Sequence, residues 1–389
     1  MEKLKIHLID LYKQNGSLFL KNTKQLKAII DKEYPETSKN KILIGISLIE
    51  EIPERLATIY SYQNLTSEPT KYIYRLKALK IQLKNKYFLN SDEVDFIIDF
   101  WAEICCYDKL IPKEREGVYG YENYKGELIV DYKYDNSYQF NEGLGFAKTK
   151  QENDKYVCID NNGNEHFTIQ TDFFCSHEHP RFSDGLVLVS FNNKYFFLNK
   201  FGKTILAIDE KNAQPFSEGL AYVSDGRKSG FINKFGEMAI PMIYDFSYEI
   251  TGFKNGLISI KKNNRAGVID TDNNIVIPFN YQHVGPFIDG IALTVNYEKY
   301  NYIDINNNII IPHIKDCFWA GDFSDGLAPI SIRGKTGFID KTGKFVIPPT
   351  YCFDTPYFVG GIAQAFLTPE SYYTNYIDKQ GNVLSGEWG

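Results

Sequence analysis

Cys175, His177 and His179 are the residues whose types and spacing point most directly to chemistry. Thiolates and imidazoles are the usual ligands of zinc, and alternate residues of a strand lie on one face. An extended conformation of this segment would therefore bring three metal ligands together. Pro180 follows directly and no fourth ligand is evident, so a polar loop between repeats is the alternative. These three residues are the candidate metal ligands, and no cofactor is predicted.

Other sequence patterns associated with catalysis are incomplete. Residues 202–204 and 334–336 both read Gly-Lys-Thr, but the first glycine of a phosphate-binding loop is missing in each case. Residues 270–274 are rich in Asp and Asn, but lack the spaced glycine and closing glutamate of a calcium loop. Nucleophile-elbow, kinase and HExxH patterns do not occur. We therefore expect a protein that is not an enzyme.

Aromatic residues that depart from the repeat pattern described below are the candidate binding residues: Trp319, Phe318, Tyr372 and Tyr373. Trp319 lies four residues before a repeated phenylalanine, Phe323, and the corresponding positions of the other repeats hold no Trp, Tyr or Phe. Aromatic side chains are enriched in the hot spots of protein interfaces. The alternative for Trp319 is that it covers the core beside an irregular repeat.

Composition and charge narrow the classes of function. The chain has 389 residues, 15% of them aromatic, and a net charge of −6. Residues 113–389 carry 34 acidic and 26 basic side chains, which argues against a nucleic-acid partner. No apolar run reaches the roughly 18 residues of a membrane span, and the N-terminus lacks a signal-peptide pattern. Six cysteines do not form a disulfide framework, so we expect buried thiols and a cytoplasmic protein.

Residues 1–112 have the periodicity of five short helices that form a small bundle. Asn22 or Thr23 is a helix start, and Asn90 begins another start signal with Glu93 three residues later. Residues 70–87 form a basic amphipathic helix, in which Arg75 and the lysines are expected on a solvated face.

This bundle resembles a helical module found in many bacterial multidomain proteins. The resemblance rests on the apolar patterns of residues 26–30 and 42–53 and on the closing Glu93…Phe100-Trp101. It implies an adaptor role and no reaction.

Residues 113–389 contain an internal repeat of about 35 residues in seven or eight units. One anchor is Phe-x-(acidic or Asn)-Gly-(Leu or Ile), whose glycines are spaced by 34 to 42 residues. A second is an apolar pair followed by Asp or Asn and, three residues later, Gly or Asn. An Asp side chain opens a turn there, and the residue three later needs a positive φ, as predicted for Gly343, Asn273 and Asn307.

Each repeat is thus expected to form about three short antiparallel strands, preceded by a connector at residues 111–116. Such units bury their aromatic residues only when stacked. The predicted fold class is a helical bundle followed by an antiparallel β-hairpin repeat array. An open curved solenoid is favoured, because propeller blades usually have four strands in 40–45 residues, and a closed β-propeller is the alternative.

The repeats resemble the bacterial WG-repeat family. The matching segments are Phe216–Ala221 with Gly230–Gly236, and Phe323–Ala328 with Gly337–Pro348. The signature tryptophan is absent, whereas the glycine after it is present in four repeats. The resemblance implies a β-repeat scaffold with a binding role and no catalytic residues. We therefore expect a non-enzymatic scaffold that recognises a protein or peptide. The alternatives are a glycan-binding protein and a metal-dependent protein that uses Cys175, His177 and His179.

Overall fold

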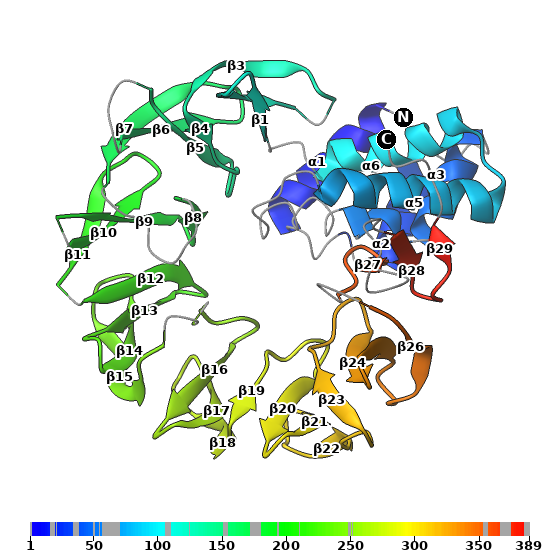
Figure 1. The fold of residues 1–389 in the computed structure, drawn as a ribbon. Helices are drawn as coiled ribbons and strands as arrows, with labels where there is room; N and C mark the ends of the chain where they lie inside the picture. The colour runs from blue at the N-terminus through cyan, green and yellow to red at the C-terminus, as the bar shows by residue number, and fades with distance from the viewer. Residues whose placement is uncertain are drawn as a thin grey trace. The chain divides into compact units, whose positions relative to one another are not determined.

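The computed structural model describes residues 2–15, 20, 22–33, 39–49, 51–53, 55–56, 71–105, 110–123, 125–150, 155–171, 180–192, 194–209, 211–247, 250, 252–352, 357–365 and 375–384. Helices occupy the N-terminal part, and antiparallel strands follow from Ile111 onward (Figure 1). The contacts divide the chain into two compact units, Met1–Tyr107 with Ile314–Gly389, and Asp108–His313. The first unit therefore contains both ends of the sequence.

The described helices lie where the sequence predicts them. They are α1 (Glu2–Asn15), α2 (Thr23–Glu33), α3 (Lys39–Ile49), α5 (Lys71–Tyr87) and α6 (Ser91–Cys105). Asn22 caps α2, because its Oδ1 accepts a hydrogen bond from the Gln25 backbone amide at 3.0 Å. Asn90 and Glu93 form a capping box at the start of α6, in which each backbone amide donates to the other side chain at 2.9 and 3.0 Å.

The core of the bundle lies around α6, which contacts α1, α3 and α5. Trp101 of α6 is fully buried, and its Nε1 donates to the Ser47 hydroxyl of α3 at 2.7 Å. The indole thus satisfies its one polar group inside an apolar core, as buried tryptophans usually do.

The strands form eight antiparallel sheets within the described residues. The first four are β1 (Ile111–Arg115), β2 (Val118–Glu122), β3 (Leu128–Tyr134); β4 (Asn136–Ser137), β5 (Leu144–Lys148), β6 (Lys155–Asp160), β7 (Glu165–Gln170); β8 (Phe182–Ser183), β9 (Leu186–Phe191), β10 (Lys194–Asn199), β11 (Thr204–Ile208); and β12 (Asn212–Ser217), β13 (Leu220–Ser224), β14 (Lys228–Asn233), β15 (Met238–Asp245). The last four are β16 (Leu257–Lys262), β17 (Arg265–Asp270), β18 (Ile275–Tyr281); β19 (His283–Val284), β20 (Ala292–Asn296), β21 (Lys299–Ile303), β22 (Ile309–Ile311); β23 (Cys317–Ala320), β24 (Ala328–Ile332), β25 (Lys335–Ile339), β26 (Phe345–Tyr351); and β27 (Ile362–Ala365), β28 (Asn375–Asp378), β29 (Val383–Leu384).

The fold class agrees with the prediction: a helical bundle is followed by antiparallel hairpin sheets, none of which closes into a barrel in the described part of the chain. The predicted number of strands needs a correction, because five of the sheets have four strands instead of three. The additional strand comes from residues that precede or include the repeated phenylalanine. In β4, β8 and β19 it has only two residues, which is too short to show an alternating pattern.

The predicted connector at residues 111–116 was wrong, because β1 occupies most of it and pairs with β2 along its whole length. Pro112 is compatible with this strand because β1 lies at the edge of its sheet, where a missing N–H costs no ladder bond. Charged residues fill the rest of the strand and hide its pattern in the sequence.

The hairpin turns of the second anchor are confirmed. In the turn between β25 and β26, the Asp340 carboxylate accepts a hydrogen bond from the Thr342 amide at 2.8 Å, and the Gly343 amide donates to the Asp340 carbonyl at 2.9 Å. Gly343 has a φ of 82°, and Asn273 and Asn307 occupy the same place with φ of 68° and 65°. Asn is the residue that best replaces Gly in this conformation.

The first anchor forms a different, tighter turn, which we call the anchor turn. Ser324 and Leu327 pair with each other, and Asp325 and Gly326 lie at the two corners with φ of 51° and 80°. Two positive φ values are the mark of a type I′ hairpin turn. Asp is common at the first corner of such a turn, but Glu142 and Glu218 hold the same place with φ of 53° and 52°, where Glu is strained and needs a compensating interaction.

Hydrogen bonds between successive anchor turns supply that compensation. The Ser183 hydroxyl donates to the Phe216 carbonyl of the next repeat at 2.6 Å, and Asp184 accepts from the Gly219 amide at 2.6 Å. A lysine reaches back, because Lys234 Nζ donates to the Asp184 carbonyl at 2.7 Å. The same types of contact recur at other turns, in Asn141 to Phe182, Ser217 to Phe253, Ser324 to Phe358, and Lys200 to the Glu142 carbonyl.

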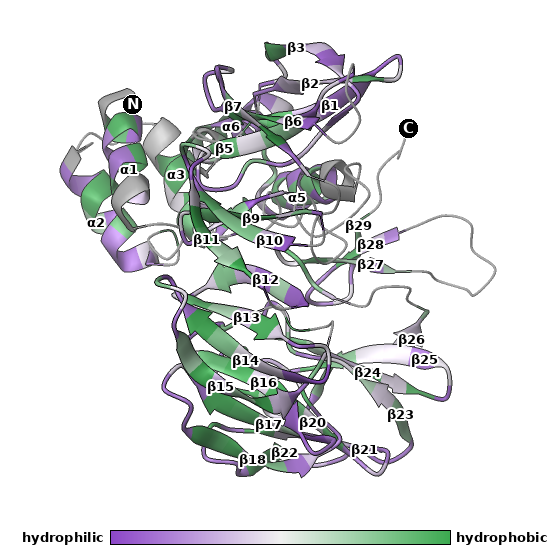
Figure 2. Cartoon of the chain, turned by 90° about the vertical axis from the view of Figure 1, so that its left-hand side faces the viewer, coloured by the Kyte–Doolittle hydropathy of each residue, from purple (hydrophilic) through white to green (hydrophobic). Residues whose placement is uncertain are grey.

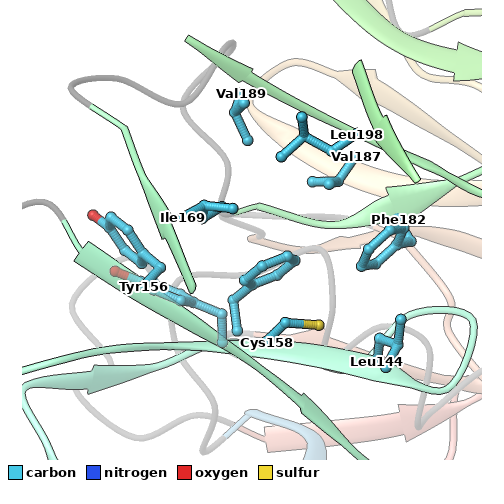
Figure 3. Packing of buried hydrophobic residues seen from close by; sticks show 10 residues of the cluster. Leu144, Tyr156, Cys158, Ile169, Phe182, Val187, Val189 and Leu198 are labelled. Carbon is cyan, nitrogen blue, oxygen red and sulfur yellow. The ribbon is translucent and has the colours of Figure 1, made fainter. Parts of the chain in front are cut away.

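Apolar side chains fill the space between neighbouring sheets. Figure 3 shows the cluster shared by the β4–β7 and β8–β11 sheets. The Phe146 and Phe182 rings stack in this cluster, with their centroids 5.7 Å apart. Cys158 is fully buried in this cluster, and burial raises the pKa of its thiol to about 12. In Figure 2 the apolar residues run along strands such as β13, β14 and β15, while the turns are polar.

Candidate functional site

Strand β23 carries two of the candidate binding residues, Phe318 and Trp319. It is the edge strand of its sheet and pairs with β24, where Cys317 lies opposite Ile332 and Trp319 opposite Ser331. Phe318 is therefore the extra residue of a β-bulge. Its side chain is 79% exposed. Bulges redirect side chains and are frequent next to functional sites.

An exposed ion pair joins the two residues that flank the hairpin of β23 and β24 in the sequence. Asp316 precedes β23 and Arg333 follows β24, and Oδ2 of the first lies 3.4 Å from Nη2 of the second. Both side chains are exposed, so the pair contributes little to stability. It places charged groups close to Phe318 in the sequence, and polar residues are usual at the rim of an interface patch.

Trp319 is partly buried and packs against its own unit. A Cβ placed on Gly321 would lie 2.8 Å from Cη2 of Trp319, 2.8 Å from Cγ of Pro329 and 2.9 Å from the hydroxyl oxygen of Tyr357. The three side chains thus meet over the Gly321 backbone, where no larger residue fits. The indole therefore contributes to packing, in contrast to the neighbouring Phe318.

Asp322 is the titratable group of this region. Its Oδ1 is buried and has no hydrogen-bond partner among the described residues. Burial raises the pKa of the carboxyl group to about 6. The pKa of the nearby Tyr357 is raised by burial and by the Asp322 carboxylate. The site can thus offer apolar, aromatic and anionic contacts.

The remaining predicted site residues lie outside the described part of the chain. This holds for Tyr372 and Tyr373 and for the metal candidates Cys175, His177 and His179. Among the residues that the structure does describe, no group of three or more His, Cys, Asp or Glu side chains is arranged to hold a metal ion.

Sequence reasoning missed Asp322 and Tyr357. Both directly precede an anchor phenylalanine, and the corresponding positions of the other repeats are Gln139, Arg181, Pro215, Gly252 and Pro286. A carboxylate at this position occurs once in the chain, and comparison of the repeats at this column would have identified it.

Comparisons with known proteins inform the fold. No curated protein sequence matches the chain. A solved structure titled "Crystal structure of the eukaryotic initiation factor" is similar at 9% identity and a TM-score of 0.50, covering 72% of this chain and 84% of that one. BamB from Moraxella catarrhalis is similar at 8% identity and a TM-score of 0.38, covering 70% and 94%. At such identities the likeness concerns the fold alone. No helix in the described ranges is long and apolar enough to cross a membrane.

The family model named "WG containing repeat" matches residues 119–156, 230–265, 267–300, 302–335 and 337–363. The structure explains why the glycine of the motif is present although its tryptophan is absent. A Cβ on Gly337 would overlap the carbonyl oxygen of Ile347 in the paired strand, so only glycine allows this pairing. Five stretches of the β-repeat part of this chain thus match the WG-containing repeat.

Proposed function

We propose that the chain is a non-enzymatic binding or scaffold protein of the cytoplasm, and that its β-repeat surface recognises a protein or peptide. The observation that carries this proposal is Phe318, a bulged edge-strand residue that is 79% exposed beside the packed Trp319. Covering an exposed phenylalanine in an interface contributes about 1.5–3 kcal/mol. Arg333 and Asp316 supply polar contacts at its border.

The charge of the repeats supports a protein partner over a nucleic acid. Residues 113–389 carry 34 acidic and 26 basic side chains. Phosphate backbones are bound mainly by lysine and arginine, so an acidic surface disfavours them.

The test compares two exposed phenylalanines. Phe318→Ala should reduce the recovery of a partner captured from the native cell, with no change in melting temperature. Phe235→Ala is the matched control, because Phe235 is 83% exposed at the tip of the β14–β15 hairpin, which belongs to the other compact unit. Trp319→Ala should lower the melting temperature, because its ring packs over Gly321. Equal recovery by the Phe318→Ala variant and the native protein would refute the role of this surface.

A further inference from the structure

The last anchor turn, Val359–Ile362, lacks the side chains that link other turns to their successors. It makes the usual hydrogen bonds with the preceding repeat, because the Phe358 carbonyl accepts from the Ser324 hydroxyl at 2.6 Å and the Gly361 amide donates to the Asp325 carboxylate at 2.7 Å. Its own first two residues, however, are Val and Gly, where Ser183 and Asp184 or similar polar residues stand in the linking turns. The turn is therefore built to receive a repeat on one side only.

Two buried arginines of the helical bundle occupy the other side of this turn. Arg55 Nε donates to the Gly360 carbonyl at 2.8 Å. Arg75 Nη1 donates to the Val359 carbonyl at 3.5 Å and also to the Ile362 carbonyl. The two arginines are 9% and 2% exposed, so the expectation of a solvated Arg75 was wrong. Burial of a guanidinium group is tolerated only where its N–H groups find acceptors.

The arginine contacts replace those of a following repeat. In two of the linking turns, the carbonyl of the second turn residue accepts from a lysine of the next repeat: Asp184 accepts from Lys234 at 2.7 Å, and Glu142 accepts from Lys200 at 3.1 Å. Gly360 is the second residue of the last turn, and its carbonyl accepts from Arg55 instead. The same acceptor is therefore used by a cation from the bundle.

The contact extends beyond the turn. Helix α5 contacts all three strands of the last sheet, β27, β28 and β29, as Figure 1 also shows. Its side chains Ala78, Leu79 and Leu83 are buried. Gln82 of the same helix accepts from Nη2 of Arg55 at 2.5 Å, which holds the guanidinium group in its orientation.

We propose that the helical bundle is the C-terminal cap of the repeat array, supplied by the N-terminal end of the chain. The binding surface is formed by Arg55, Arg75 and the adjacent face of α5. Its partner is the last anchor turn, whose Val359, Gly360 and Ile362 carbonyls accept hydrogen bonds from the two arginines. Terminal units of repeat proteins need such a cap, because their outer face has no further repeat to cover it. This assigns a structural docking role to a module whose resemblance implies an adaptor.

The proposal is tested in the full-length protein by cutting one bond. A specific protease site is inserted between Tyr107 and Asp108, the folded protein is cleaved, and co-elution of the two pieces is followed at decreasing concentration. The pieces of the native sequence should remain together at micromolar concentration. Arg75→Gln should weaken their association by about tenfold or more, since hydrogen bonds from a charged donor are lost. Lys80→Gln is the control, because Lys80 lies on the same helix in a half-exposed ion pair with Asp95.

A second pair of variants leaves the bundle unchanged. Gly361→Ala places a Cβ 3.0 Å from Nε of Arg55, whereas Gly326→Ala places it in open space at the same position of the preceding turn, with a φ of 80° against 77°. Backbone strain is thus matched, and only the arginine contact differs. Weaker association for Gly361→Ala than for Gly326→Ala supports the cap. The cap proposal is overturned if the two pieces of the native sequence separate. It is also overturned if Arg75→Gln and Gly361→Ala associate as strongly as their controls, Lys80→Gln and Gly326→Ala.

Discussion

At the scale of single residues, Asp322 makes stability depend on pH in an unusual direction. Its folded-state pKa of about 6 lies above the ordinary value of 3.8, so the native state binds more protons than the unfolded state between these values. The free energy of unfolding therefore falls as pH rises through this window. A difference of two pKa units corresponds to about 3 kcal/mol at most.

Asp322→Asn removes this dependence, because the amide does not ionise. As the pH rises from 4 to 8, the free energy of unfolding of the variant should increase relative to that of the native protein, by up to about 3 kcal/mol. Urea unfolding at the two pH values measures the gain. A stability difference that is the same at both pH values would show that the carboxyl group titrates normally.

Gly343 gives a second prediction at this scale. Its φ of 82° suits Gly and, less well, Asn, but opposes a β-branched side chain. Gly343→Val should lower the free energy of unfolding by about 1–2 kcal/mol or more, and Gly343→Asn by much less. Equal melting temperatures of the two variants would contradict the turn geometry.

Residue patterns predict local structure well where one side chain decides the backbone. Asn90 and Glu93 signal the start of α6, and Asn273 reveals its positive φ by standing where other repeats have Gly. The burial of Arg75 and of Asp322 cannot be predicted in this way. Each depends on a segment distant in the sequence or on the packing of a neighbouring repeat.

At the scale of elements, the anchor turns act as links as well as hairpins. Glu218 has a φ of 52°, and its carboxylate accepts from the backbone amides of Asn255 and Gly256 in the next repeat at 2.6 and 2.7 Å. The strained backbone is retained because it directs the carboxylate to the following turn. The acidic residue of the family motif is thus explained by the contact between repeats.

Glu218→Gly tests this explanation. The substitution relieves the positive φ but removes both contacts, and we expect a net loss of about 1–2 kcal/mol in the free energy of unfolding. Glu116→Gly is the control, since Glu116 has a φ of 53° in the β1–β2 hairpin, outside the anchor turns. It should be neutral or slightly stabilising. If Glu218→Gly stabilised the protein, the hydrogen bonds from Asn255 and Gly256 to Glu218 would contribute nothing to the free energy of unfolding.

Some strands cannot be predicted from the pattern of apolar residues in the sequence. Hairpins joined by a recognisable turn, such as β25 and β26, are evident from the sequence. Strand β8 has two residues, and β1 consists largely of charged residues and a proline, so neither has a readable period. A short edge strand is recognised by its pairing with the neighbouring strand, and this pairing is known only from the three-dimensional structure.

At the scale of the whole molecule, one compact unit joins the two ends of the sequence. Helix α5 contacts the last sheet, in which Ile377 is fully buried with Phe338 and Phe358. Elements in contact within one compact unit tend to open together, whereas the other unit should be unaffected. Local stability should therefore follow the compact units and not the order of the sequence.

Ile377→Ala in β28 tests this coupling. Removal of this side chain should cost about 2–5 kcal/mol locally. Native-state hydrogen exchange should then quicken for the amides of α5 as well as β28, although some 300 residues separate them in the sequence. The amides of β14 belong to the other unit and should keep their protection. Ile269→Ala in β17 is the reciprocal control, because Ile269 is fully buried in that other unit and should leave α5 protected. Unchanged exchange in α5 after Ile377→Ala would mean that the bundle and the last sheet open independently, although α5 contacts all three strands of that sheet.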